Sequence, residues 1–526
     1  MLKLPYRSDH RHVIQRVIVR GTLVLDTPTC LGTGDADSPT DMPVLRDNLE
    51  RNKALLTGSS IAGALRNYLR EYSQKYGHIE ERNDLTTKLF GDLFAYKNEK
   101  GLSEQDKIRL RENDSQSSLI IDDGISTQPI QSELRDGVKI NSITRTAADK
   151  AKYDLELLQA GTEFPLCFEL LIDQKEKDQI KQEIYEAELR KGLAIALSGL
   201  EKGEISLGMK KRRGFGRCHV KEWQVWNFDL TDASDRMAWL TIDHSWSTNP
   251  PCTKSPAIDS SIVAAMKKAG LNVPEDWEDQ RDRFTIDATF TLASPLLIRS
   301  GQAETGCAPD VVHLKSHRHG ELKPILSGTS LAGVLRHRAE RIVKTLQCSC
   351  NQNPECNTEP EIIKSIFGDV NQTRSQASRL IINESVIHNT TDLVQTRIAI
   401  DRFTGGTYHG ALFQEQPVFG NDNTEIKNLE IELRNPKEYE IGLLLLLLKD
   451  LWTEDLPVGG GSSVGRGRLR GKEAKIEWKN LEWKIKQNDD NSLHTTPETA
   501  KKTLQNYVSE LVTYIKENNN NEPSNP

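Results

Sequence analysis

The chain has 526 residues, a formal net charge of −7 at pH 7 and 36% hydrophobic residues. That length allows two or more domains, each with its own core. The acidic balance excludes a general polycation, so any surface that binds phosphates must be local. Eight cysteines are too few for a disulfide scaffold. The N-terminus lacks a secretion signal and no apolar run could span a bilayer, so we expect a soluble cytoplasmic protein without membrane contact.

The predicted elements of the first half follow in the order strand, helix, strand, strand, helix, strand. In chain order they cover residues 12–31, 58–72, 119–122, 164–172, 178–200 and 218–225. Alternating apolar and polar residues predict the strands, and the spacing of Ile61, Leu65 and Leu69 predicts the first helix. A further strand-like segment covers 138–143, and the charged residues 97–118 are typical of a surface insertion.

The second half repeats this order and predicts the same fold. Its elements cover residues 284–292, 329–345, 380–382, 429–433 and 438–452, with a long loop at 401–416. The pattern in each half predicts a split βαβ, ferredoxin-like α+β core. The expected domain boundaries are 12–226 for the first domain, 227–281 for a connector with one helix near 260–268, 282–480 for the second domain, and 481–526 for a C-terminal helix with a disordered tail.

One sequence occurs twice, at the start of the first helix in each half. Residues 58–66 read GSSIAGALR and residues 328–336 read GTSLAGVLR, so six of nine positions match at an offset of 270 residues. Ser59 or Ser60 would serve as N-cap of the first copy. Unpaired N–H groups at such a helix start form an anion site, most often for phosphate. A capped core helix with nothing bound is the alternative interpretation.

Further matches in the same order indicate a duplicated domain rather than a short-period solenoid. Asp41 lies 17 residues before Gly58, and Asp310 lies 18 residues before Gly328. A Phe-Gly-Asp sequence follows each helix, at residues 90–92 and 367–369.

Each half ends in a glycine loop that is rich in Lys and Arg. These two glycine loops are residues 208–217 and 459–468. A run of charge is usually a solvated face, but equal placement in both halves favours a local surface for phosphates.

Together, four features resemble the RAMP superfamily of CRISPR-associated proteins, which act in antiviral defence. They are the first strand, the loop Asp before a Pro-Val or Val-Val segment, the SGxSxxGxLR-type helix start and the late Gly-x-Gly-Arg loop. Within that superfamily the likeness is to the Cas-seven backbone subunits of type III RNA-targeting effectors. Two units in one chain resemble the tandem fusion of III-D-like complexes. The similarity covers about 12–225 and 282–475.

The resemblance implies two tandem RRM-like RAMP domains with insertions. It implies a guide-RNA-binding backbone subunit that is also an endoribonuclease, cleaving complementary target RNA with Asp41 and Asp310 as catalytic residues and Mg²⁺ or Mn²⁺ as cofactor. RNA carries its own 2′-OH nucleophile, so a carboxylate that holds a metal ion or accepts a proton suffices. Asp37 is a rival in the same loop, but only Asp41 gives nearly equal separations from the repeated glycine.

For RNA, the resemblance implies phosphate contacts from the helix starts and glycine loops, and stacking by aromatic residues of a protruding thumb. The candidate RNA-binding residues are Ser59, Ser60, Arg66, Ser330, Arg336, Lys210, Lys211, Arg212, Arg213, Arg217, Arg466, Arg468, Phe403 and Tyr408. The thumb of the first half would lie within about 141–163. The expected partners are a guide RNA, the complementary target RNA, and the large signalling, other backbone and small subunits of a type III effector.

One cysteine cluster has the spacing of a metal site. Cys348, Cys350 and Cys356 with His337 would give a tetrahedral Cys₃His site for structural Zn²⁺. Unpaired loop cysteines or a redox pair are the alternatives. The first half has no cysteines at the equivalent place, so we expect zinc only in the second domain.

Two other functions stay open. The chain could be an architectural RNA-binding subunit without catalysis. It could also be a metal-independent, guide-RNA-processing endonuclease, for which His219 and His409 are the candidate histidines. Neither histidine has a counterpart in the other half.

Overall fold

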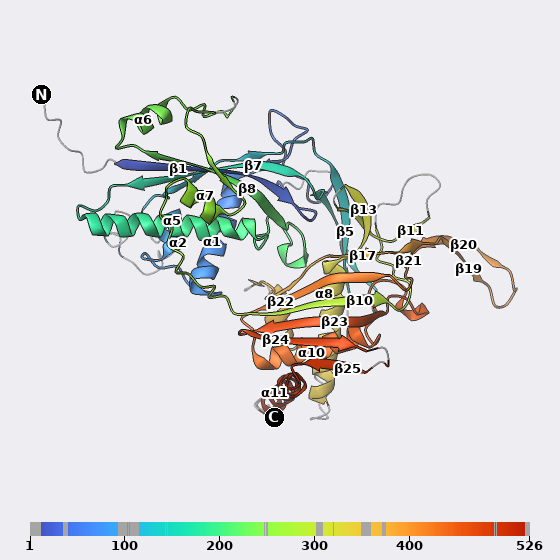
Figure 1. Cartoon of the computed structure of the whole chain (residues 1–526). Coiled ribbons are helices and arrows are strands. Elements are labelled where there is room, and N and C mark those ends of the chain that lie inside the picture. Colours follow the sequence, from blue (N-terminus) through green and yellow to red (C-terminus); the bar gives the residue numbers. More distant parts are fainter. Residues whose placement is uncertain are drawn as a thin grey trace, which may run out of the picture.

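Two βαββαβ units follow one another in the chain and lie against each other (Figure 1). The computed structural model describes residues 12–34, 40–92, 103, 105, 115–141, 144, 146–246, 248, 251–300, 309–318, 320–348, 359–370, 375–488, 490 and 492–520. The first unit consists of β1 (Val13–Leu25), α1 (Gly58–Gln74), β3 (Leu119–Ile121), β7 (Glu163–Asp173), α5 (Gln179–Glu201) and β8 (Cys218–Asp229). The second unit consists of β10 (Arg283–Leu292), α8 (Gly328–Cys348), β16 (Leu380–Ile382), β22 (Glu425–Arg434), α10 (Glu438–Trp452) and β23 (Leu469–Trp478).

Both sheets have the strand order of a ferredoxin-like fold. In the first half β1 lies between β7 and β8 and is antiparallel to both, while β3 pairs with the far edge of β7. In the second half β10 lies between β22 and β23, and β16 pairs with β22. The predicted α+β class and the two-unit architecture are therefore confirmed.

Helices cover one face of each sheet and form the two cores. In β1, Val17, Val19 and Leu23 are fully buried against α1 and α5, as expected from alternation in a half-buried strand. The leucine run of α10 is buried nearly all round, because the sheet covers one side and α11 (Ala500–Asn520) the other. A helix that is apolar on all faces needs such cover on both sides.

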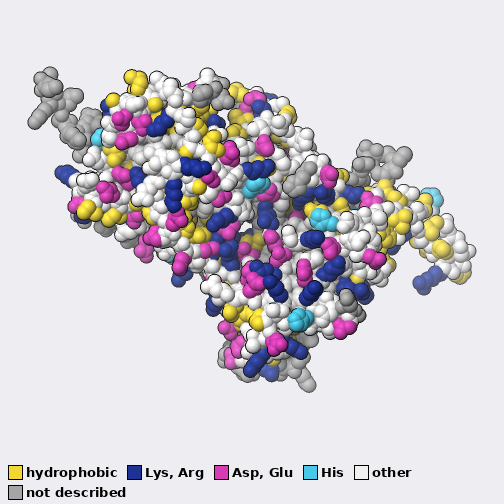
Figure 2. All heavy atoms as spheres, in the orientation of Figure 1, with side chains coloured by type: hydrophobic (Ala, Val, Ile, Leu, Met, Phe, Trp, Pro, Cys, Tyr) yellow, Lys and Arg dark blue, Asp and Glu magenta, His cyan; other side chains and the backbone are white. Residues whose placement is uncertain are grey.

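The outer faces of the two sheets differ. In the first half, residues after β8 that include α6 (Ala233–Leu240) fold over this face and bury Trp226 and Phe228. In the second half the outer face is bare and carries Lys, Arg, Asp and Glu side chains intermingled (Figure 2).

Segments expected as a connector and a tail are built into the sheets and cores of the two domains. Within residues 227–281, β9 (Ala257–Asp259) pairs with β8, and α7 (Ile262–Lys268) packs in the first core. After residue 480, β24 (Leu481–Gln487) and β25 (Leu493–Thr496) extend the second sheet. The C-terminal helix α11 stacks Tyr514 on Tyr439 of α10, with ring centroids 3.8 Å apart.

Each half also has a two-stranded hairpin outside its sheet. The first pairs β5 (Ser132–Ile140) with β6 (Ala147–Leu158), and the second pairs β19 (Gln395–Ile400) with β20 (Thr407–Gln416). The second hairpin projects away from the body of the protein (Figure 1). Residues 401–416 were expected as a loop, but most of them form β20. Its exposed side chains lack the one-sided burial that produces a readable strand pattern.

The remaining elements are short. They are α2 (Leu85–Phe90), α9 (Glu361–Phe367), β2 (Leu55–Leu56), β4 (Gly124–Ile125), β11 (Val311–Val312), β12 (Lys315–Arg318), β13 (Glu321–Leu326), β14 (Asp369–Val370), β15 (Ser375–Gln376), β17 (Ser385–His388), β18 (Thr391–Asp392), β21 (Val418–Phe419) and the 3₁₀ turns η1 (Lys211–Arg213) and η2 (Ser462–Val464). Within the described residues, no helix is both long and apolar enough to cross a membrane.

Candidate nucleic-acid interface and catalytic site

Asp41 and Asp310 occupy the same position in the two halves. The backbone N–H of Asp154 on β6 donates to Asp41 Oδ2 at 2.8 Å, and the backbone N–H of Gln414 on β20 donates to Asp310 Oδ2 at 2.8 Å. In both halves the next residue forms a parallel bridge to the next residue of the hairpin strand, Met42 to Leu155 and Val311 to Glu415. The alignment of Asp41 with Asp310, made from spacing alone, therefore corresponds to the same backbone geometry.

Both carboxylates are exposed at the inner end of a hairpin. The segment after Asp41 is held by Glu156, which accepts from Val44 N at 2.9 Å and from Arg46 Nη2 at 2.8 Å. Mg²⁺ in phosphate-transfer sites is commonly held by one or two carboxylates while substrate phosphates complete the shell. One exposed carboxylate in each half fits that requirement. In the described part of the chain, no group of three or more His, Cys, Asp or Glu side chains is arranged to hold a metal ion.

At the start of α1, the N–H groups expected to bind a phosphate already have partners in the protein. Thr57, rather than Ser59 or Ser60, is the N-cap of α1, and its Oγ1 accepts from Ser60 N at 3.3 Å. The carboxylate of Asp123 accepts from Gly58 N at 2.6 Å. An anion does lie at this helix N-terminus, but it belongs to the chain.

The repeated arginine and the repeated Phe-Gly sequence contact each other. Arg66 donates to both carboxylate oxygens of Glu80, most closely at 2.7 Å, and also donates to the carbonyl of Gly91 at 3.2 Å. In the second half, Arg336 forms two 2.8 Å bonds to Glu359 and donates to the carbonyl of Phe367 at 3.5 Å. These arginines, expected at RNA, thus fasten the turn after α2 or α9 to the repeated helix.

The first glycine loop packs against the second half. Arg212 donates to the carbonyl of Ser378, and Arg217 pairs with Glu430 at 2.8 Å. Burial, followed by repulsion from Arg336 and Arg212, lowers the pKa of Arg213. Lys210 lies 3.7 Å from the ring centroid of Tyr153, and burial also lowers the pKa of Lys211. Most cations predicted to contact phosphate thus already have partners in this chain.

The second glycine loop has no such cover. Residues 459–465 are exposed. Arg466 is buried and pairs with Glu415 at 2.9 Å, whereas Arg468 is exposed. Ser330 is partly buried.

The two hairpins have different surroundings. The β5–β6 hairpin reaches the second half, where Ser316 Oγ donates to Glu133 at 3.0 Å and Arg135 pairs with Glu384 at 3.2 Å. Burial opposes the charge of Arg135, but Glu384 and Glu133 outweigh it and raise its pKa. On the β19–β20 hairpin, the stacking candidates Phe403 and Tyr408 are 97% and 59% exposed, so both rings are accessible.

The histidines near these sites differ in burial. His313, three residues after Asp310, is buried; its Nδ1 accepts from Ile298 N and its Nε2 donates to the carbonyl of Ile325, both at 3.1 Å. Burial lowers the pKa of His313 to about 4. His219 contacts Asp26 at 2.8 Å, and His409 is exposed on β20.

The predicted zinc ligands fall largely outside the described residues. His337 lies on α8, but Cys350, Cys356 and the side chain of Cys348 are outside the described part of the chain. The zinc site stays a prediction.

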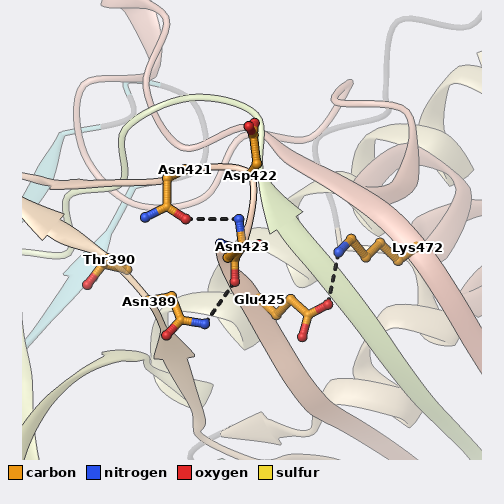
Figure 3. Close-up of a pocket in the computed structure, with 7 residues that line it drawn as sticks. All are labelled: Asn389, Thr390, Asn421, Asp422, Asn423, Glu425 and Lys472. Atoms are coloured by element: carbon orange, nitrogen blue, oxygen red, sulfur yellow. Dashed lines mark hydrogen bonds and ion pairs between the residues drawn. The ribbon is translucent and has the colours of Figure 1, made fainter.

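A polar pocket of 610 Å³ lies on the second half between the segments that follow β17 and β21 (Figure 3). Its lining residues bond one another: Asn389 Nδ2 donates to the backbone carbonyl of Asn423 at 2.9 Å, and Lys472 pairs with Glu425 at 2.9 Å. None of the sequence-predicted site residues lines it.

Several residues at these contacts had no sequence signal. Glu80 and Glu359 follow their arginines at unequal distances, 14 and 23 residues. Asp123 and Glu384 had a usable signal, because each closely follows a Leu-Ile-Ile strand, at residues 119–121 and 380–382. Two residues before each strand, Ser117 and Ser378 contact equivalent carbonyls, one in α2 or α9 and one at the first residue of the strand.

A family model described as the RAMP superfamily matches residues 22–219 and 289–470. These two regions make up well over half of the chain, and each runs from within the first strand of one βαββαβ unit to the start of its last strand. A search of curated proteins gave no match to the chain. The duplicated ferredoxin-like fold and the two matched regions agree that this chain belongs to the RAMP superfamily of CRISPR-associated, RNA-binding proteins and carries two RAMP domains.

Proposed function

We propose that this chain is a guide-RNA-binding backbone subunit of a type III CRISPR effector, and that it cleaves target RNA at two places through Asp41 and Asp310. The observation that carries this proposal is the matched position of the two carboxylates. Each is exposed, fixed by one backbone N–H of a hairpin, and located where that hairpin leaves its domain. A structural turn residue need not keep this arrangement in both copies.

In the proposed reaction, the 2′-OH of the target strand attacks the adjacent phosphorus to form a 2′,3′-cyclic phosphate, and the 5′-oxygen leaves and takes a proton from water. The chain's contribution is to position the strand and to present a carboxylate oxygen that accepts the hydroxyl proton or holds a cation. The hydrogen bond to Oδ2 restricts rotation of the carboxylate, so its geometry is set before substrate arrives. Mg²⁺ or Mn²⁺ held by Asp41 or Asp310 would stabilise the charge of the phosphate.

Cleavage also requires a local distortion of the target strand, and we assign this role to the hairpins. Phe403 and Tyr408 near the tip of the β19–β20 hairpin offer exposed rings on which a base could stack. A base displaced at each hairpin would leave the neighbouring phosphodiester free to adopt in-line geometry.

The test uses the effector purified with its guide RNA and a target RNA labelled at one end. Asp41→Ala should remove one product band, Asp310→Ala another, and the double variant both, with guide RNA content unchanged. If both bands persist in the double variant, the chain is architectural and another subunit cuts. Cleavage that survives EDTA would instead favour a metal-independent nuclease.

A further inference from the structure

The two hairpins meet Asp41 and Asp310 in the same way, so their residues can be compared one by one. Asp154 supplies the N–H that fixes Asp41, and Gln414 supplies the N–H that fixes Asp310. Each donor residue lies directly opposite one residue of the partner strand, and the side chains of directly opposite residues share one face of a hairpin. These opposite pairs are Asp136 with Asp154, and Thr396 with Gln414.

Beside Asp41 this face is charged. Lys152 lies two residues before Asp154 on β6, so both side chains point to the same face. The Nζ atom of Lys152 is 3.5 Å from Asp136 Oδ2 and 3.7 Å from Asp154 Oδ1. The side chain of Lys152 is 65% exposed, and Asp136 is exposed as well. We call Asp136 and Lys152 the Asp–Lys pair, which holds a carboxylate and an ammonium group next to each other on the hairpin surface.

Beside Asp310 the equivalent positions are uncharged. The register places Thr396 at the position of Asp136, and Leu412 at the position of Lys152. Leu412 is 62% exposed, so an apolar side chain stands where the first hairpin has an ammonium group. The two sites therefore share a carboxylate but differ in the side chains that a target strand would meet beside it.

The nucleotide displaced at each hairpin is the group that these side chains would meet. A displaced base is not paired with the guide, so its Watson–Crick edge is free to form hydrogen bonds with protein. An exposed apolar side chain contacts the ring of any base, whereas charged groups recognise the pattern of donors and acceptors along its edge. Guanine presents two neighbouring donor nitrogens, N1 and N2, beside the acceptor O6. It alone among the four bases offers two donor nitrogens to a carboxylate and an acceptor to an adjacent ammonium group.

We propose that the Asp–Lys pair makes cleavage at Asp41 selective for guanine as the displaced base, whereas cleavage at Asp310 accepts all four bases. This inference rests on the proposed function, because it concerns the target strand at the same two sites. Asp136 accepts hydrogen bonds from N1–H and N2–H of guanine, and Lys152 donates to O6. At the other site, Leu412 packs against the displaced base without reading its edge.

Four target RNAs that differ only in the displaced nucleotides test this inference in the effector purified with its guide RNA. One guide serves all four targets, since the displaced nucleotides do not pair with it. Single-turnover rates are measured separately for the product formed at Asp41 and for the product formed at Asp310. In the wild-type protein, the first product should form about tenfold faster with guanine than with the other bases, and the second at the same rate with all four.

Exchanging the residues between the hairpins should exchange the preference. Asp136→Thr/Lys152→Leu installs the residues of the second hairpin, and the rate at Asp41 should become independent of the base. Thr396→Asp/Leu412→Lys installs the Asp–Lys pair in the second hairpin, and the rate at Asp310 should come to favour guanine. All four positions are exposed, so the core is not involved, and in each variant the unaltered hairpin is the internal control.

The inference is overturned if the wild-type protein cuts at Asp41 with equal rates for all four bases, or prefers a base other than guanine. It is also overturned if the guanine preference survives in Asp136→Thr/Lys152→Leu, or if Thr396→Asp/Leu412→Lys gains none. Cleavage that depends on Asp41 and Asp310 but ignores the base leaves the proposed function standing. Cleavage that persists in Asp41→Ala/Asp310→Ala overturns the proposed function and this inference with it.

Discussion

Asp41 accepts a hydrogen bond of 2.8 Å from the backbone N–H of Asp154, 113 residues further along the chain. Asp310 and Gln414 repeat this relationship in the other half, also at 2.8 Å. The donor is a backbone group, so the bond does not depend on the side chain at position 154. This explains why an Asp in one half and a Gln in the other are equally compatible with it.

Replacing Asp41 by Asn separates the chemical role of this residue from its structural role. The amide oxygen can still accept from Asp154 N, so the melting temperature should not change, whereas target cleavage at this site should fall by about 10²–10⁴-fold. Asp154→Asn is the matched control, and it should retain cleavage. Equal cleavage by wild type and Asp41→Asn would show that Asp41 is a turn residue.

The two glycines of the repeated sequence should respond in opposite ways to alanine. A Cβ at Gly58 would lie 2.4 Å from the carbonyl oxygen of Ile121, which must then move, so Gly58→Ala should destabilise by about 1–3 kcal/mol. A Cβ at Gly63 meets nothing within 4 Å, and Gly63→Ala should stabilise α1 by about 0.5–1 kcal/mol. Urea unfolding measures both, and Gly328→Ala with Gly333→Ala repeats the comparison in α8.

His313 should make stability depend on pH. Its pKa is about 4 in the folded chain and about 6.5 when exposed, so the unfolded state binds more protons between these values. The contribution is complete above pH 6.5 and is lost as pH falls toward 4, with a total of about 3 kcal/mol. His313→Gln should be less stable at neutral pH, but its free energy of unfolding should change less between pH 6.5 and pH 4. Chemical denaturation across this range measures the difference, and parallel profiles would contradict the assignment.

Glu384 should be essential to the contact between the halves. Its buried carboxylate meets Arg135 from the first half and Arg318 from the second. Glu384→Ala removes the carboxylate that both guanidinium groups contact, and it should lower the free energy of unfolding by about 3–5 kcal/mol. Calorimetry should then show the halves unfolding separately. Glu482→Ala, on an exposed strand, is the control and should unfold like the wild type.

The duplication, the βαββαβ order and the equivalence of Asp41 with Asp310 could all be predicted from the sequence. Each rests on local information, namely the apolar period of a half-buried strand or helix and the spacing between motifs. The same reasoning missed β20, and within residues 227–281 it predicted the helix α7 but neither β9 nor the packing of both elements on the first domain. The exposed hairpin lacks a buried side to shape its pattern, and β9 and α7 are short elements whose place is set by contacts with β8 and the first core.

What the sequence alone determined was which residues recur; what each recurring residue does was decided by the tertiary structure. Arg66 and Arg336 recur with the helix, yet they bind Glu80 and Glu359, which recur at different spacings. The sequence shows no partner for the cations of the first glycine loop, but in the fold Arg212 and Arg217 pair with a carbonyl and a carboxylate of the second half. Charged groups separated by hundreds of residues pair because the packing of the domains brings them together, and no local sequence pattern records that packing.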